Sequence, residues 1–170
     1  MKKGTKLMLA ALVLMVSASS SFGQSTATAT ATATIVTPIS ITKDVDMNFG
    51  NVAVQASTGG TVVLTPAGAR SVTGGVTLPA VNGTVTAASF TVDGQGTYTY
   101  AITLPSANLT ISSGANTMVV NTFTSTPSAT GALTAGTQTL NVGATLTVAA
   151  AQAAGVYVSG TPFNVTVNYN

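Results

Sequence analysis

The sequence predicts an all-β protein, an antiparallel β-sandwich of about eight or nine strands. Apolar and polar residues alternate with a period of two along most of the 170-residue chain, which is the repeat of a half-buried strand. The composition agrees with this fold class, because 32 Thr and many Val residues favour pleated sheet, whereas 17 Gly residues favour tight turns. Turn-forming clusters such as Asn82-Gly83 and Asp93-Gly94 separate the alternating runs.

The expected strands follow the alternation in order along the chain. The first alternating run spans 26–41, where Ile35, Ile39 and Ile41 can form the first strand of the domain, and further strands are expected at residues 47–54, 61–65, 83–92, 97–104, 117–124, 137–148, 156–159 and 163–169. The Ala-rich stretch at 149–154 is too short to form a stable helix and is closed by Gly155, so we expect a loop or a single turn there.

Bulky side chains mark the inner faces of these strands. Tyr98 and Tyr100 share one phase with Ile102 and Leu104, which predicts that both tyrosines belong to the core. Tyr157 follows Gly155 and is expected to make the hydroxyl-to-backbone bond of a tyrosine corner.

The first 23 residues have the three parts of a secretory signal peptide. Three Lys residues precede a ten-residue apolar run at 7–16, and small residues lead to a cleavage site between Gly23 and Gln24. The apolar run is only about half as long as a membrane-spanning helix. We therefore predict an exported protein, secreted to the periplasm, the outer surface or the medium, with no membrane anchor in its mature chain.

After the cleavage site, Thr and Ala alternate as far as Thr34. We divide the chain into a signal peptide (1–23), an alternating Thr/Ala leader (24–34) and a β-sandwich domain (35–170). Tracts of this kind are often linkers, and the Ala side chains at 27, 29, 31 and 33 would fill the groove of a neighbouring subunit poorly, so a self-complete sandwich with a flexible leader is favoured over a donor strand, which stays open as the alternative.

Charge is scarce, and its distribution excludes several functions. The basic pI of 9.2 comes from the three Lys residues of the signal peptide. The remaining residues carry Lys43 and Arg70 against three Asp residues, a net charge of −1. Nucleic-acid binding needs clustered cations, so it is not expected.

Catalysis and metal binding are not expected either. The chain contains no His, Cys, Glu or Trp, which removes the residues of most nucleophilic, acid-base and zinc sites. The spacing of Asp44, Asp46 and Asn48 begins like a calcium loop, but Gly50 falls one residue late and Gln55 stands where Glu is required. We therefore predict a non-enzyme with no catalytic residue, no cofactor and no bound metal. Arg70 is expected to be solvated or to fix a loop by hydrogen bonds.

Several segments resemble a bacterial secreted family catalogued as domain of unknown function 4402. The resemblance rests on residues 35–41, on Met47-Asn48-Phe49-Gly50-Asn51-Val52, on the stretch from Thr61 to Val76 and on the ending at 163–169. More distantly, Asn48 to Val52 and the penultimate Tyr169 resemble chaperone-usher pilins and spore-coat-U-like domains. That resemblance implies an immunoglobulin-like sandwich, and in pilins an N-terminal extension completes the sheet of the neighbouring subunit.

Together these observations predict a structural or adhesive cell-surface protein, such as a fimbria-like subunit that pairs with itself or with other surface subunits through strand edges. Charged side chains usually protect exposed sheet edges, and this chain has almost none. The residues of the possible assembly strands are Ile35, Ile39, Ile41, Phe163, Val165, Val167 and Tyr169. The alternative is a secreted monomeric module that binds a glycan or a protein.

The cleavage site gives a direct test. Export of the full precursor from a bacterial host should yield a mature chain that begins at Gln24, because small residues at Ser21 and Gly23 suit signal peptidase. Intact mass and N-terminal sequencing of the exported protein measure this. An exported chain that keeps residues 1–23 would contradict the prediction.

Overall fold

The computed structural model describes residues 23–170, and residues 35–170 form one compact unit. The predicted signal peptide at 1–22 lies outside the described residues. Residues 23–34, described by themselves, contain no strand, and every one of them is exposed. Between residues 23 and 170 there is no helix, so the predicted all-β class is confirmed. Nothing in that range is helical and apolar enough to cross a membrane.

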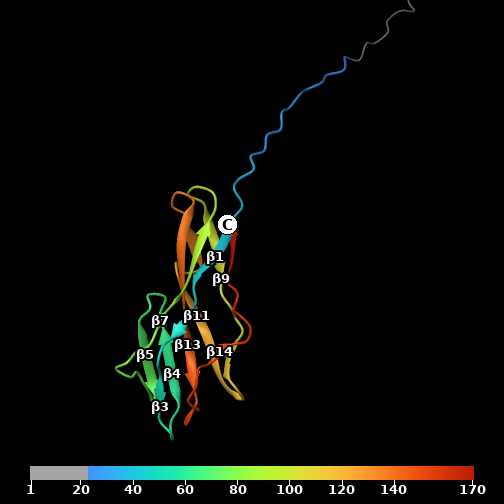
Figure 1. Cartoon of the computed structure of the whole chain (residues 1–170). Coiled ribbons are helices and arrows are strands. Elements are labelled where there is room, and N and C mark those ends of the chain that lie inside the picture. Colours follow the sequence, from blue (N-terminus) through green and yellow to red (C-terminus); the bar gives the residue numbers. More distant parts are fainter. Residues whose placement is uncertain (1–22) are drawn as a thin grey trace, which may run out of the picture. The chain divides into compact units, whose positions relative to one another are not determined.

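The largest sheet has eight antiparallel strands (Figure 1). Six follow the order β1-β8-β13-β11-β10-β14, and β4 joins β13 while β5 pairs with β4. Their bounds are β1 Ser40–Val45, β4 Gly60–Leu64, β5 Arg70–Gly74, β8 Ala88–Asp93, β10 Leu109–Ser113, β11 Asn116–Thr126, β13 Thr137–Val148 and β14 Val158–Ser159.

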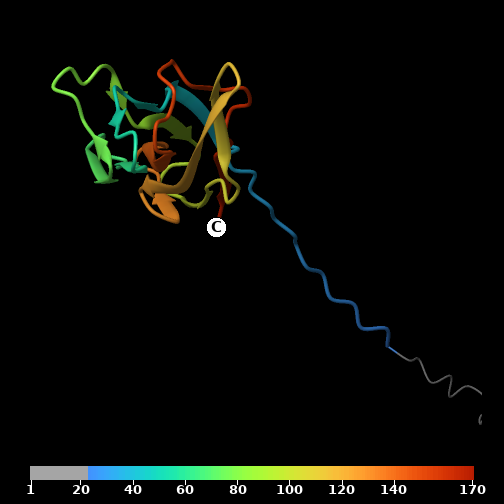
Figure 2. The ribbon, with the colours of Figure 1, turned by 90° about the horizontal axis from the view of Figure 1, so that it is seen from below.

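Three smaller sheets complete the domain. One has the order β12-β9-β15, with β9 Thr99–Thr103, β12 Thr130–Ala132 and β15 Thr166–Tyr169. Two are pairs of very short strands, in which β2 Asn48–Phe49 pairs with β7 Val85–Thr86, and β3 Ala53–Val54 pairs with β6 Val76–Thr77. Figure 2 looks roughly along the strands of the domain.

The strand β13 holds the large sheet together. Residues Thr137 to Val142 pair with β8, and residues Ala144 to Val148 pair with β4 on the same edge. The other edge pairs with β11. Apolar residues on alternate positions point inward, and Thr occupies most of the outward positions, as the period-two pattern predicts.

The buried side chains form two clusters that share β13. The first core cluster lies between β8 and β13 of the large sheet and the strands β9 and β15, and its buried members include Val92, Leu140, Tyr100 and Val167. Two sheets therefore face each other across it, as in a sandwich. The second core cluster lies toward the other end of β13, where its buried members are Val62, Val76, Val120, Ala144, Leu146 and Val148.

The predicted strand at 47–54 is split into two pieces. Gly50 has a φ of +68° and separates β2 from β3. A side chain at this position would collide with the carbonyl oxygen of Asn82 and with Val85. The apolar positions change phase across Gly50, from Met47 and Phe49 to Val52 and Val54, and the backbone turns there in a conformation that glycine tolerates easily.

Tyr100 is fully buried, as predicted, whereas Tyr98 is 47% exposed, so the core assignment of Tyr98 is wrong. Tyr98 lies just before β9 and packs edge to face on Tyr169 at a centroid distance of 5.6 Å. The phase of the two residues is the same, but the facing layer does not extend over Tyr98, and alternation carries no information about that limit.

Burial of Tyr100 predicts an alkaline loss of stability. Desolvation raises the pKa of the Tyr100 phenol above its ordinary value, because the phenolate is disfavoured in the core. The stability linked to this group is complete below pH of about 10 and is lost as the pH rises through the folded-state pKa. The hydroxyl donates to Gln138 Oε1 at 2.8 Å.

In Tyr100→Phe that component of the alkaline loss should disappear. The variant should lose about 1 kcal/mol at neutral pH with the hydrogen bond, and then fall less steeply than wild type above pH of about 10. Denaturant unfolding followed by circular dichroism across this range measures both effects. Equal slopes in the two proteins would contradict the assignment.

Candidate functional site

The predicted assembly residues come together on the first core cluster rather than on a free surface. Ile39 and Ile41 pack against it from the start of β1, and Phe163, Val165 and Tyr169 pack against it from the C-terminal segment. Val167 is one of its buried members. Ile35 differs from the others, since its side chain is 93% exposed. Both segments therefore belong to their own domain, and only Ile35 faces solvent fully.

Tyr169 holds the N-terminal and C-terminal segments of the domain together. Its hydroxyl donates to the Thr37 carbonyl oxygen at 2.8 Å and accepts from the Gln95 backbone N–H at 2.6 Å. The Gln95 side chain in turn accepts from the backbone N–H and the hydroxyl of Thr37. The sequence singled out the penultimate tyrosine, but not these partners, which lie 74 and 132 residues away from it.

An apolar groove of about 1030 Å³ lies over the second core cluster. Three neighbouring strands supply its floor, with Leu109 and Ile111 from β10, Met118 and Val120 from β11, and Leu146 and Val148 from β13. Leu109, Ile111 and Met118 are only partly buried, although they pack against the core cluster, whereas Val120 is buried. The groove thus leaves apolar floor side chains incompletely covered.

Two chain segments form the walls of the groove. One wall is the segment at 45–54, which contains β2 and β3. These strands pair with β7 and β6 on one edge only, and among the described residues no strand pairs with their other edge. The opposite wall comes from residues 152–159 with Pro162 and Phe163. An extended peptide between the walls would lie on the apolar floor beside the segment that carries this unpaired edge.

Side-chain hydrogen bonds order the second wall. The Tyr157 hydroxyl donates to the Ala153 carbonyl oxygen at 2.7 Å, four residues upstream, which is the backbone bond predicted for this tyrosine. Gln152 Nε2 donates to that same hydroxyl at 2.8 Å and to the Thr117 carbonyl oxygen at 3.3 Å. The loop is therefore fixed to β11, beside the floor of the groove.

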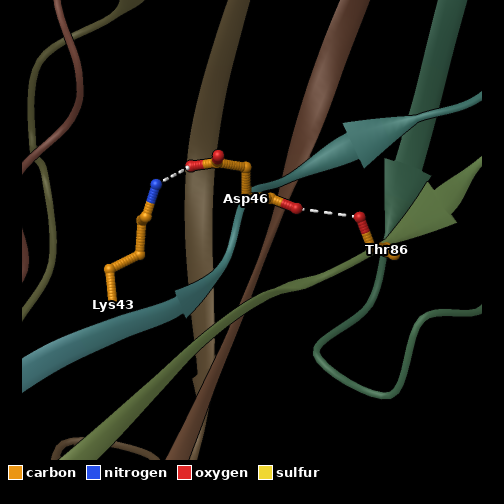
Figure 3. Close-up of polar contacts among 3 residues, drawn as sticks. All are labelled: Lys43, Asp46 and Thr86. Atoms are coloured by element: carbon orange, nitrogen blue, oxygen red, sulfur yellow. Dashed lines mark hydrogen bonds and ion pairs between the residues drawn. The ribbon is translucent and has the colours of Figure 1, made fainter.

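Lys43 and Asp46, which both line the groove, form an ion pair (Figure 3). Lys43 Nζ lies 2.8 Å from Asp46 Oδ1, with both side chains largely exposed, so the pair adds little stability. The Thr86 hydroxyl donates to the Asp46 backbone carbonyl at 2.8 Å. Asp44 accepts a hydrogen bond from Thr91 instead of joining Asp46. Within residues 23–170 no three metal-ligating side chains gather into a group.

Arg70 fixes loops, which is one of the two roles expected for it. Its guanidinium group donates to the backbone carbonyls of Phe49 and Asn51 and to Asn82 Oδ1. These acceptors belong to the first wall of the groove and to the loop at 80–84 that precedes β7. Sequence reasoning identified Arg70 as one of two cations of the mature chain, but not its link to a groove.

Fold and groove together define a class: an antiparallel β-protein with an apolar groove bordered by a free strand edge. The chain belongs to the family described as domain of unknown function (DUF4402), whose model matches residues 39–169, well over half of the sequence. The resemblance to this family predicted from the sequence is thereby confirmed. Neither the curated proteins nor the solved structures contain a match.

Proposed function

We propose that this protein is an exported structural subunit of the bacterial cell surface that assembles by β-strand addition into the apolar groove. The signal-peptide pattern at 1–23 supports export. The observation that carries the assembly role is the groove itself, where partly buried apolar side chains meet the unpaired edge of β2 and β3. A fimbria-like or adhesive role follows if the subunits join end to end.

The proposed occupant is the Thr/Ala leader of a second copy. Residues 24–34 are exposed throughout, contain no strand and carry no charged side chain, so their insertion would bury no ion. The sequence favours an extended conformation for them, and the distant likeness to pilins points the same way. Residues 24–34 can therefore serve as the donor strand without burying a charge.

The strand register supports addition between copies. Thr37 is bound near Gln95 and Tyr169, at the end of the domain where Ser40 pairs with Asp93. The groove floor uses Leu146 and Val148, which pair with residues at the start of β4 near the opposite end of β13. A contact between unlike ends of two copies is heterologous and can continue into a filament.

A charge on the groove floor tests the assembly role. The mature protein should form oligomers that grow with concentration, seen by light scattering and electron microscopy. Ile111→Asp should abolish them, because an unpaired carboxylate would face the inserted strand. Thr110→Asp is the matched control, since Thr110 is exposed on the other face of the same strand. Thermal unfolding of each variant shows whether it folds.

Deletion of residues 24–34 identifies the inserted strand. The shortened protein should stay monomeric, and a synthetic peptide of this sequence should bind to it. Assembly of the shortened protein equal to wild type would make the leader a linker. A mature protein that is strictly monomeric at high concentration would contradict the structural role as a whole.

The exposure of Tyr98 favours a second candidate function, binding of a glycan. Half-exposed aromatic rings supply stacking platforms for sugars, and Tyr98 is 47% exposed and braced by Tyr169. Tyr98→Ala should then abolish saturable binding to a glycan array while leaving oligomerisation unchanged. Equal binding by both proteins would remove this candidate.

A further inference from the structure

Arg70 is bound entirely by uncharged acceptors. It begins β5, and its Nη1 donates to the Phe49 carbonyl and, at 3.0 Å, to the Asn51 carbonyl. Its Nη2 donates to Asn82 Oδ1 at 3.1 Å. The one salt bridge among the described residues is Lys43–Asp46, so no carboxylate neutralises Arg70. Its charge instead strengthens hydrogen bonds that join two loops.

The two loops that Arg70 joins fit together closely. The Asn51 backbone N–H donates to the Asn82 carbonyl at 2.7 Å, and the Asn51 side chain donates to the Val81 carbonyl at 3.0 Å. A Cβ on Gly50 would meet the Asn82 carbonyl, Val85 and Arg70 Nη1 together. The guanidinium group thus lies beside a backbone turn that has no room for another atom.

That turn is also part of the groove wall. Phe49, Gly50 and Asn51 line the groove, whereas Arg70 does not. We propose that Arg70 is a positioning residue for strand capture: it holds the wall at 49–51 in place without touching the incoming strand. This inference rests on the proposed function, since it assigns a role within the same groove.

The geometry requires arginine rather than any cation. Two nitrogens of one planar guanidinium group reach three acceptors. Nη1 binds the carbonyls on either side of Gly50, and Nη2 binds the side chain of Asn82. Lysine presents its donors from a single atom and cannot reproduce this fork. Arg70→Lys therefore keeps the positive charge but loses the simultaneous hydrogen bonds to the segment at 49–51 and to Asn82.

Hydrogen exchange and assembly kinetics of the full mature chain test the proposal. In Arg70→Lys, the hydrogen-exchange rate of the amides at 49–54 should rise about tenfold or more. Loss of the charged hydrogen bonds should increase the population of the locally open wall by about that factor. Amides of β13 should keep their wild-type protection. Oligomer growth should slow by a similar factor. Asn82→Ala, which removes one acceptor, should have the same effect in weaker form.

Ser71→Ala is the matched control, because Ser71 is exposed and adjacent to Arg70 in β5. It should exchange and assemble like wild type. Unchanged exchange at 49–54 in Arg70→Lys, or exchange that rises equally throughout the domain, would overturn the positioning role. Faster exchange at the wall with assembly at the wild-type rate would also overturn it. If the wild-type protein itself does not assemble, the proposed function is wrong. That outcome is distinct from failure of the positioning role, in which the wild-type protein assembles but Arg70→Lys changes neither the wall nor the assembly rate.

Discussion

The structure depends on one strand, β13, whose backbone is paired on one edge over almost its whole length and on the other edge from Asn141 to Thr147. It gives one edge to β11 and divides the other between β8 and β4. Gly143 lies at the point of division, where a Cβ would run into the Leu64 carbonyl and the backbone of Thr65. The two core clusters lie on either side of this point, with Leu140 and Val142 in the first and Leu146 and Val148 in the second. Because both clusters share β13, the position of the groove relative to the Tyr169 contacts is set by the register of this strand.

Because the domain has few charged residues, its sheet surface consists mainly of Thr side chains. Outward positions of β13 and its neighbours carry mainly Thr, and cross-strand pairs such as Thr91 with Thr139 and Thr61 with Thr147 repeat across the sheet. These side chains suit the pleat without adding charge. The stability of the domain must then come from burial and backbone pairing, since its one salt bridge is exposed. The low number of charged residues also leaves the strand edges with few of the Lys or Glu side chains that usually discourage pairing between molecules.

The sequence predicted those elements whose information is local. The alternation predicted β13 at its observed bounds, 137–148, and it predicted the buried Tyr100. It failed at Gly50, where a positive φ divides a stretch that was predicted as one strand, and at Tyr98, where the facing layer ends. The alternation could not predict the groove, because the two walls of the groove, at 45–54 and 152–163, are about a hundred residues apart in the sequence. The floor of the groove comes from three further strands. Arg70 and Tyr169 were noticed as unusual residues, but their partners depend on tertiary contacts that no local pattern encodes.

The composition of the leader determines how firmly such a groove can hold it. Burial contributes about 25 cal/mol per Å² of apolar surface, so the small Ala side chains at 27, 29, 31 and 33 add little to binding. Backbone hydrogen bonds to the free edge of β2 and β3 would supply most of the attraction, and each is worth only about 1 kcal/mol net of water. The floor residues Ile111 and Met118 would remain incompletely covered by methyl groups alone. A leader of this kind therefore favours reversible association, in which occupancy follows subunit concentration, over the permanent joining that large apolar donor residues would give.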